Sequence, residues 1–174
     1  MTDSAVTVRA GARGDATRIA ALHTASWRSA YAGIMPDSFL NGPLSADRLA
    51  LWQQRLADNP SAAGLFVAEC GPELVGFVYL IPRPDGRILL DNLHALPGRT
   101  RSGVGTLLFR RALRWAATEY PGCAVYLEVL QENKPAIAFY ERHGGRRTDA
   151  RLGRFEQGFE LPEFEYTWTP PFSA

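Results

Sequence analysis

A glycine-bearing segment near the middle of the chain has the residue types that bind an anion. Residues 96–106 read LPGRTRSGVGT and lie between an expected strand and an expected helix. Glycines let the backbone approach a ligand closely, and the start of a helix carries about half a positive charge. The segment predicts a phosphate site, whose contacting residues are expected to be Arg101, Ser102, Gly103, Val104, Gly105 and Thr106.

The same segment lacks the features of two common phosphate loops. A dinucleotide-binding fingerprint needs a further glycine where Leu108 stands, and a P-loop needs Gly-Lys followed by Ser or Thr. The diphosphate of coenzyme A remains as the predicted ligand. A close contact between a helix and a strand is the alternative explanation for a single GxG.

Two segments resemble motifs of the GNAT N-acetyltransferase superfamily. Residues 97–108 resemble its acyl-CoA-binding motif, Arg/Gln-x-x-Gly-x-Gly/Ala after a strand. Thr100 stands at the Arg/Gln position, so Arg99 or Arg101 is expected to replace the missing side chain. Residues 127–145 resemble Asn-x-x-Ala-x-x-Phe-Tyr-x-x-x-Gly-Phe, with Gly145 where an aromatic residue is usual.

The resemblance implies that acetyl-CoA is the co-substrate. In the family the Asn contacts the pantetheine arm and the Tyr protonates the departing thiolate, and these roles fall on Asn133 and Tyr140. The strand before the glycine loop serves the acyl and pantetheine groups, here through the backbone N–H groups of Leu93, His94 and Ala95. A helix N-cap for Asn133 and core packing for Tyr140 are the alternatives.

Acetyl transfer also requires a base. A primary ammonium has a pKa of about 10, so a group must remove its proton at neutral pH. Glu128 is the first candidate and resembles a Glu at that position in ribosomal-protein N-terminal acetyltransferases, and His94 is the second. A solvated or ion-paired Glu128 and a structural His94 are the alternatives.

The acceptor is expected against residues 25–36. Trp27 and Tyr31 are the predicted substrate-binding residues, with core packing as the alternative. The helix pair around them resembles that of family members acting on polyamines or other small amines, so a small amine or polyamine-like molecule is the expected acceptor. A protein N-terminus or lysine as acceptor, and a non-catalytic acyl-CoA sensor, are the other hypotheses.

Hydrophobic periodicity predicts the elements that position these residues. Strands are expected over residues 6–9, 65–69, 74–81, 88–96, 124–130 and 160–168, and helices from residues 14, 45, 103 and 135. A further strand completes the predicted order β-α-α-β-β-β-α-β-α-β-β. The fold class is α/β (α+β), and the resemblance implies the GNAT fold, a central mixed, mostly antiparallel six- to seven-stranded sheet with helices on both faces.

The composition is typical of one globular domain, residues 1–174, with 46% hydrophobic and 21% charged residues. A net charge of +1 favours no nucleic-acid partner, and no apolar run approaches the roughly 18 residues that span a bilayer. A cytoplasmic location is therefore expected. Cys70 and Cys123 are expected to be buried free thiols, and no residue spacing suggests a metal site. A homodimer that covers the apolar tail 168–172 is a further expectation.

Overall fold

The computed structural model describes residues 5–173, which form two compact units. The first unit comprises the residues up to Leu80 together with Asn92–Ala112, and the second comprises Ile81–Asp91 and the residues from Leu113 onward. The seven strands are β1 (Val6–Ala10), β2 (Leu65–Cys70), β3 (Glu73–Pro82), β4 (Ile88–Ala95), β5 (Val125–Leu130), β6 (Arg146–Arg154) and β7 (Glu160–Trp168).

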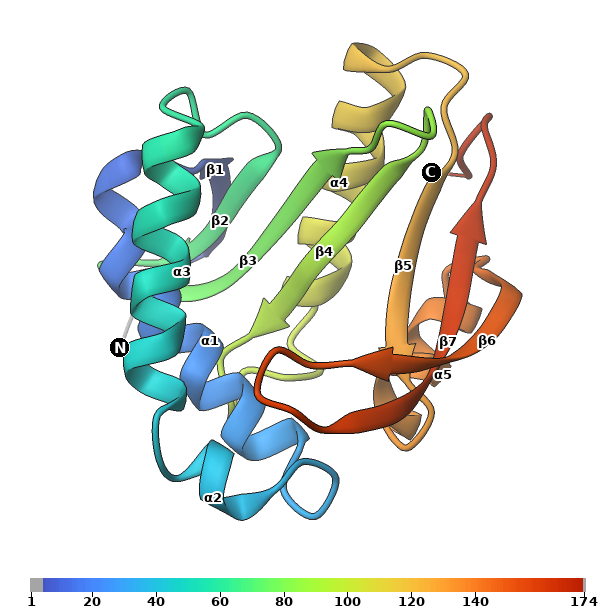
Figure 1. The fold of residues 1–174 in the computed structure, drawn as a ribbon. Helices are drawn as coiled ribbons and strands as arrows, with labels where there is room; N and C mark the ends of the chain where they lie inside the picture. The colour runs from blue at the N-terminus through green and yellow to red at the C-terminus, as the bar shows by residue number, and fades with distance from the viewer. Residues whose placement is uncertain (1–4, 174) are drawn as a thin grey trace. The chain divides into compact units, whose positions relative to one another are not determined.

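These strands are hydrogen-bonded in the order β1-β2-β3-β4-β5-β7-β6 (Figure 1). Antiparallel pairs join β1 with β2, β2 with β3, β5 with β7 and β6 with β7, whereas β4 and β5 are parallel. The prediction of a mixed, mostly antiparallel sheet of six to seven strands is confirmed.

The helices are η1 (Arg13–Asp15), α1 (Ala16–Ala30), α2 (Asp37–Leu40), α3 (Leu44–Asp58), α4 (Val104–Glu119) and α5 (Lys134–Arg142). All were expected except η1 and α2, which are one turn or less. In α2, Phe39 and Leu40 are buried although the flanking segment contains turn residues. Tertiary packing of these two side chains therefore stabilises a helical turn that is too short for hydrophobic periodicity to indicate.

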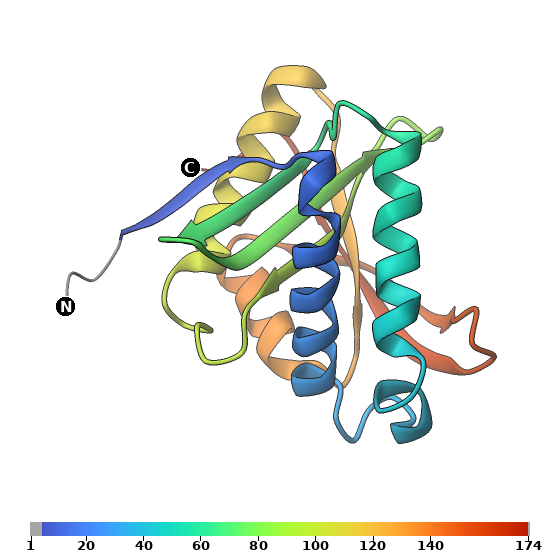
Figure 2. The same cartoon turned by 90° about the vertical axis from the view of Figure 1, so that its left-hand side faces the viewer.

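In the first unit, the central strand β3 is buried from Leu74 to Leu80. Its Phe77 faces α1 and α3, with its ring centroid 5.5 Å from that of His23 and 5.2 Å from that of Trp52. Figure 2 shows α1 and α3 side by side against this part of the sheet. The apolar stripes predicted for both helices therefore form one face of the core.

Gly76 sets the start of α4 against the other face of β3. A Cβ atom at this position would lie 2.7 Å from Val104 Cγ1 and 2.8 Å from Leu108 Cδ1, distances that real side chains do not reach. Only glycine permits this approach. Because Phe77 and Gly76 point to opposite faces, helices cover both faces of the sheet in this unit, as predicted.

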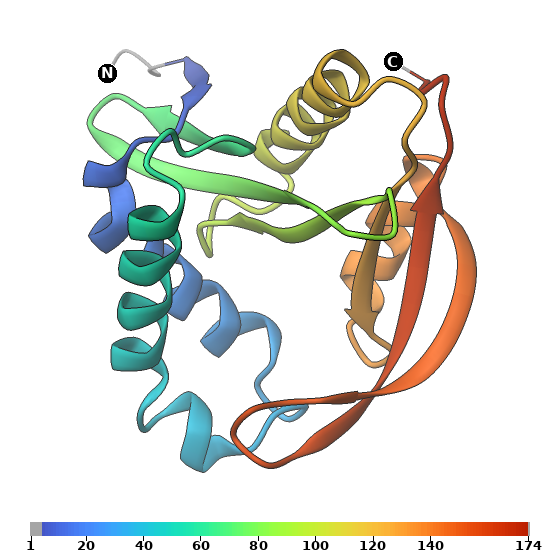
Figure 3. The same cartoon turned by 45° about the horizontal axis from the view of Figure 1, so that its top comes forward.

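In the second unit, β6 and β7 form a long curved hairpin (Figures 1 and 3). β7 also pairs with β5, from Val125 opposite Trp168 to Leu130 opposite Glu163. The parallel pairing of β5 with β4 covers Ile88 and Leu89. The α5 helix begins after Asn133, whose Oδ1 accepts a hydrogen bond from the Ala136 N–H at 3.4 Å.

The packing of Trp168 explains why position 145 is a glycine, where the family's second motif usually has an aromatic residue. A Cβ atom on Gly145 would lie 2.6 Å from Trp168 Cζ2 and 2.9 Å from the Tyr140 carbonyl oxygen. The Trp168 indole also donates to the His143 carbonyl at 2.9 Å. An aromatic side chain from the end of β7 is thus packed against position 145, and Trp168 is 6% exposed.

Three other expectations concern features outside the core. Cys70 and Cys123 are free thiols, but both are only partly buried, which corrects the expectation of full burial. Among residues 5–173, no helix is long and apolar enough to cross a bilayer. The same residues contain no group of three or more His, Cys, Asp or Glu side chains placed to hold a metal ion.

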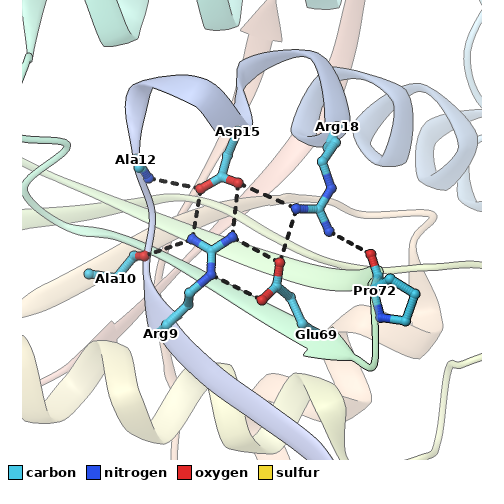
Figure 4. A network of polar contacts seen from close by, with 7 residues as sticks. All are labelled: Arg9, Ala10, Ala12, Asp15, Arg18, Glu69 and Pro72. Carbon is cyan, nitrogen blue, oxygen red and sulfur yellow. Dashed lines mark hydrogen bonds and ion pairs between the residues drawn. The ribbon is translucent and has the colours of Figure 1, made fainter.

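A polar network joins β1, β2 and the start of α1 (Figure 4). The Arg9 guanidinium donates to both carboxylate oxygens of Asp15, at 2.8 and 2.9 Å, and to both of Glu69, at 2.8 and 3.0 Å. Arg18 donates to Glu69 at 3.0 Å, and Asp15 accepts from the Ala12 N–H at 2.9 Å. Asp15 is thereby a three-fold acceptor at the entry to α1.

We expect Asp15→Asn to lower the free energy of unfolding by about 1–3 kcal/mol, because a buried charged acceptor is lost. Hydrogen bonds from Arg9 lower the pKa of Asp15, so its contribution is complete above the ordinary pKa and is lost as pH falls through the lowered one. Urea unfolding at neutral and acidic pH measures both effects. The exposed control Asp58→Asn should change stability by at most about 0.5 kcal/mol; equal losses for the two variants would contradict the expectation.

Candidate functional site

The predicted phosphate loop connects β4 to α4 within the first unit. Its backbone is left-handed at Gly98, Arg101 and Gly103, with φ of 87°, 67° and 85°. The Leu107 N–H donates to the carbonyl oxygen of Gly103, the residue before α4, at 3.0 Å. The N–H groups of the preceding turn therefore lie at the open start of α4, where an anion is stabilised.

The structure separates the two arginines that could replace the motif's usual basic residue. Arg99 is held 3.4 Å from Glu73 by an ion pair. Arg101 forms neither a hydrogen bond nor an ion pair with any other part of residues 5–173. Arg101 is therefore the one whose charge is available to a ligand at the loop. The Ser102 hydroxyl donates to the Arg99 carbonyl, which closes the turn.

The β4 backbone offers alternating donors. The Leu96 N–H donates to the Val75 carbonyl on β3 at 2.9 Å, and strand alternation directs the His94 N–H to the same side. The N–H groups of Leu93 and Ala95 then point away from β3. Of the three predicted backbone donors, these two are oriented for a ligand, whereas the His94 backbone belongs to the sheet.

The His94 side chain points toward α1. Its Nδ1 lies 2.9 Å from Ser26 Oγ, and its ring centroid lies 4.7 Å from that of His23. Burial and, next, the positive charge of Arg48 lower the pKa of His94 to about 4. The ring is neutral at pH 7, and it is a weaker base than an ordinary histidine.

We expect His94 to titrate near pH 4 in the folded protein. The unfolded chain takes up this proton near the ordinary pKa of 6.5, so stability is complete above that pH. It should fall by about 3 kcal/mol as the pH falls to about 4, at 1.36 kcal/mol per unit of pKa difference. Imidazole NMR signals followed from pH 8 to pH 4, assigned with His94→Asn, measure the pKa. Titration near 6.5 would contradict the assignment.

His23 lies in the interior of the first unit. Its Nδ1 accepts a hydrogen bond from the Trp52 indole at 3.0 Å, and its side chain is fully buried. Burial lowers its pKa well below 6.5, and repulsion from His94 when that ring is protonated, and from Arg48 and Arg55, adds to this effect. The position of His23 on the apolar stripe of α1 was visible in the sequence, but periodicity alone could not indicate its hydrogen bond with Trp52.

Trp27 and Tyr31, the predicted acceptor residues, lie at the end of α1 in an aromatic cluster. The Trp27 ring centroid is 5.3 Å from that of Tyr31 and 5.1 Å from that of His23. The Arg48 guanidinium lies over the Trp27 ring at 4.6 Å. The structure therefore brings Trp27 into one cluster with the two histidines.

Tyr140, the predicted acid, lies on α5 in the second unit and is 9% exposed. Its ring packs edge-on against Trp168, with 5.9 Å between centroids, and its carbonyl accepts the Gly145 N–H at 2.9 Å. These contacts fix the orientation of the phenol. The N-cap alternative for Asn133 is present in the structure.

Glu128, the first candidate base, is 41% exposed and ion-paired with Arg151 at 2.5 Å. Its strand partner is Glu165, whereas Tyr140 packs on Trp168, the partner of Val125. Since odd and even strand positions face opposite sides, Glu128 and Tyr140 belong to opposite faces of this part of the sheet. The ion-paired alternative for Glu128 is thus observed.

Glu163 is a titratable residue that no sequence motif indicated. Burial raises its pKa, and the nearby charge of Glu128 adds to that effect. A Cβ atom on Gly153 would lie 2.3–2.8 Å from its carboxyl group, so the missing side chain at 153 provides its space. The alternation of acidic and bulky residues in β7 indicated a strand, but not that Glu163 would be partly buried and Glu165 fully buried.

Comparison with known proteins was consistent with one family. The chain matches the family model described as Acetyltransferase (GNAT) family over residues 18–145. A relative from Mycobacterium tuberculosis, named Probable N-acetyltransferase, is 26% identical over 176 residues, which cover 98% of this chain and 88% of the relative.

Two solved structures share the fold. PaiA N-acetyltransferase from Thermoplasma acidophilum, in complex with coenzyme A, has a TM-score of 0.78 at 17% identity and covers 95% of this chain and 99% of its own. The protein yncA from Salmonella typhimurium, with its cofactor acetyl-CoA, has a TM-score of 0.71 at 17% identity, with 98% and 97% covered. At these identities the likeness concerns the fold alone.

Proposed function

The chain belongs to the acetyltransferase (GNAT) family, and from this premise we propose that it transfers an acetyl group from acetyl-CoA to a small primary amine. The observation that carries the proposal is the loop before α4, with its left-handed turn, open helix start and available Arg101. Residues 1–174 act as one domain in this proposal. A cytoplasmic location and a homodimer remain parts of the prediction.

The donor side of the reaction uses backbone groups in the first unit. The loop N–H groups and Arg101 are proposed to bind the diphosphate of acetyl-CoA, because charge-assisted hydrogen bonds to an anion are strong. The Leu93 and Ala95 N–H groups are proposed to bind the pantetheine arm and the thioester oxygen. Asn133 keeps its N-cap bond through Oδ1 and can offer its amide N–H₂ to the pantetheine.

The proposed transfer is a direct attack within a ternary complex. The amine nitrogen forms a bond to the acetyl carbon as the carbon–sulfur bond breaks, so no covalent enzyme intermediate and neither cysteine is required. Tyr140 donates its phenol proton to the departing sulfur. The ammonium proton leaves to a base or to water.

Glu128 remains the proposed base, acting through water because it and Tyr140 belong to opposite faces of this part of the sheet. His94 is disfavoured because its Nδ1 already contacts Ser26 Oγ at 2.9 Å and its ring packs against that of His23, with 4.7 Å between centroids. Glu128 is a carboxylate at an exposed strand position, and its partner Arg151 is 38% exposed, so the ion pair is open to water and to exchange.

The acceptor is proposed to contact Trp27 and Tyr31. Thiol release from acetyl-CoA should be measured against a panel of small amines, polyamines and peptides with free N-termini. Release that depends on a small amine, with the acetylated product identified by mass, is the expected result. Release with peptides alone would favour the protein acetyltransferase hypothesis, and acetyl-CoA binding with no release from any acceptor would favour a sensor.

A further inference from the structure

Three buried polar atoms in the first unit have no hydrogen-bond partner among residues 5–173. They are Nε2 of His23, Nε1 of Trp27 and Nε of Arg48. His23 and Trp27 lie one turn apart on α1, and Arg48 lies on α3, which runs beside α1 in Figure 2. The centroid of the His23 ring lies 5.1 Å from that of the Trp27 ring, and Arg48 Cζ lies 4.6 Å from the same Trp27 centroid.

All three atoms are donors. An indole N–H and an arginine Nε–H can only donate. The Trp52 indole donates to His23 Nδ1 at 3.0 Å, which requires a lone pair on that nitrogen. Burial keeps the pKa of His23 well below 6.5, so its ring is neutral and its single proton lies on Nε2. The cluster therefore presents three N–H groups and no acceptor.

The positive charge beside the three donors also favours an anionic acceptor. Arg48 is cationic, and its side chain is 12% exposed. Its Nη2 donates to Asp47 at 2.8 Å, which leaves its Nε unused. The positive charge of Arg48 is among the causes that lower the pKa values of both His23 and His94. Buried donors beside a cation are complementary to an oxyanion.

We propose that the acceptor amine carries a carboxylate, whose oxygens accept hydrogen bonds from His23 Nε2, Trp27 Nε1 and Arg48 Nε. The inference rests on the proposed acetyl transfer to a small primary amine, and it narrows that class to amino acids and related amino-carboxylates. A polyamine would bring a second cation toward Arg48 and would leave the three donors unpaired.

Binding can be tested without turnover, through the tryptophan side chains. The chain has four tryptophans, so the ¹⁵N-labelled protein gives four indole N–H signals, and Trp27→Phe assigns the one of interest. With coenzyme A present, each common amino acid is titrated beside the amine that lacks its carboxylate, such as leucine beside isopentylamine. At least one amino acid should shift the Trp27 signal more than its matched amine does, while the Trp115 and Trp168 signals stay in place.

Kinetics provide the second readout. The KM of the best amino acid should be about 10- to 100-fold below that of its matched amine, the range expected for hydrogen bonds to a charged group. Arg48→Gln should bring the ratio of the two KM values close to one, and Trp27→Phe should reduce it. The surface control Arg110→Gln should leave the ratio unchanged. Circular dichroism and thermal unfolding establish that each variant is folded.

Two results would overturn the inference. One is a Trp27 signal that no amino acid shifts, which would mean that the donors serve a buried water or packing alone. The other is an equal KM for amino acids and matched amines, unaffected by Arg48→Gln. Failure of the proposed function would look different, because acetyl-CoA would then neither bind nor be consumed with any acceptor.

Discussion

Replacing Tyr140 with phenylalanine should lower kcat by about 10²- to 10³-fold, within the range that a positioned general acid contributes. The affinity for acetyl-CoA should change little. The phenol is held by edge-on packing against Trp168 and by the helix that Asn133 caps, so the substitution removes one oxygen from an otherwise fixed ring. The departing thiolate would then have to take its proton from water.

Steady-state thiol release and acetyl-CoA calorimetry on the same preparation separate these effects. Tyr120→Phe is the matched control, because Tyr120 is also a tyrosine of the second unit packed edge-on against a tryptophan, Trp115. That variant should keep kcat within about two-fold, as expected for a surface substitution. A Tyr140→Phe enzyme with undiminished kcat would mean that Tyr140 is a packing residue.

Gly103→Val should raise the Kd for acetyl-CoA by about 10- to 100-fold, since each hydrogen bond to a charged group is worth about 1.5–3 kcal/mol. At φ of 85° a β-branched residue is strained, although no atom lies within 4 Å of the position its Cβ would take. The backbone is expected to relax away from the left-handed region, which turns the first N–H groups of α4 from the diphosphate.

A matched control separates strain from binding. Gly86 has φ of 82°, has the same open surroundings and lies in the turn between β3 and β4. Gly86→Val should therefore lose a similar amount of stability without any change in Kd. Equal Kd values for Gly103→Val and the wild type, measured by calorimetry, would contradict a diphosphate at this loop.

Much of the fold was predictable because its signals are local. Helical periodicity placed α1 and α3, and turn residues such as Pro97 and Gly98 bounded β4. The loop motif and the Asn133 to Tyr140 segment are also contiguous in the chain. Local patterns therefore indicated the donor side of the proposed reaction.

Long-range packing accounts for what the sequence did not reveal. The place of an aromatic residue at 145 is taken by Trp168, which lies more than twenty residues away in the chain. The contact of Ser26 with His94 and the position of Arg48 over Trp27 each join different elements. Such contacts depend on tertiary packing, and they form the proposed acceptor side of the site.

The most direct test of the central claim is calorimetric titration of the purified protein with acetyl-CoA. We expect one binding site per chain, with a Kd between about 1 μM and 1 mM, the range usual for enzyme substrates. The affinity should fall with Gly103→Val and persist with Tyr140→Phe. The absence of binding heat at millimolar acetyl-CoA, with a folded protein, would contradict the assignment of the loop before α4 and the acetyl transfer built on it.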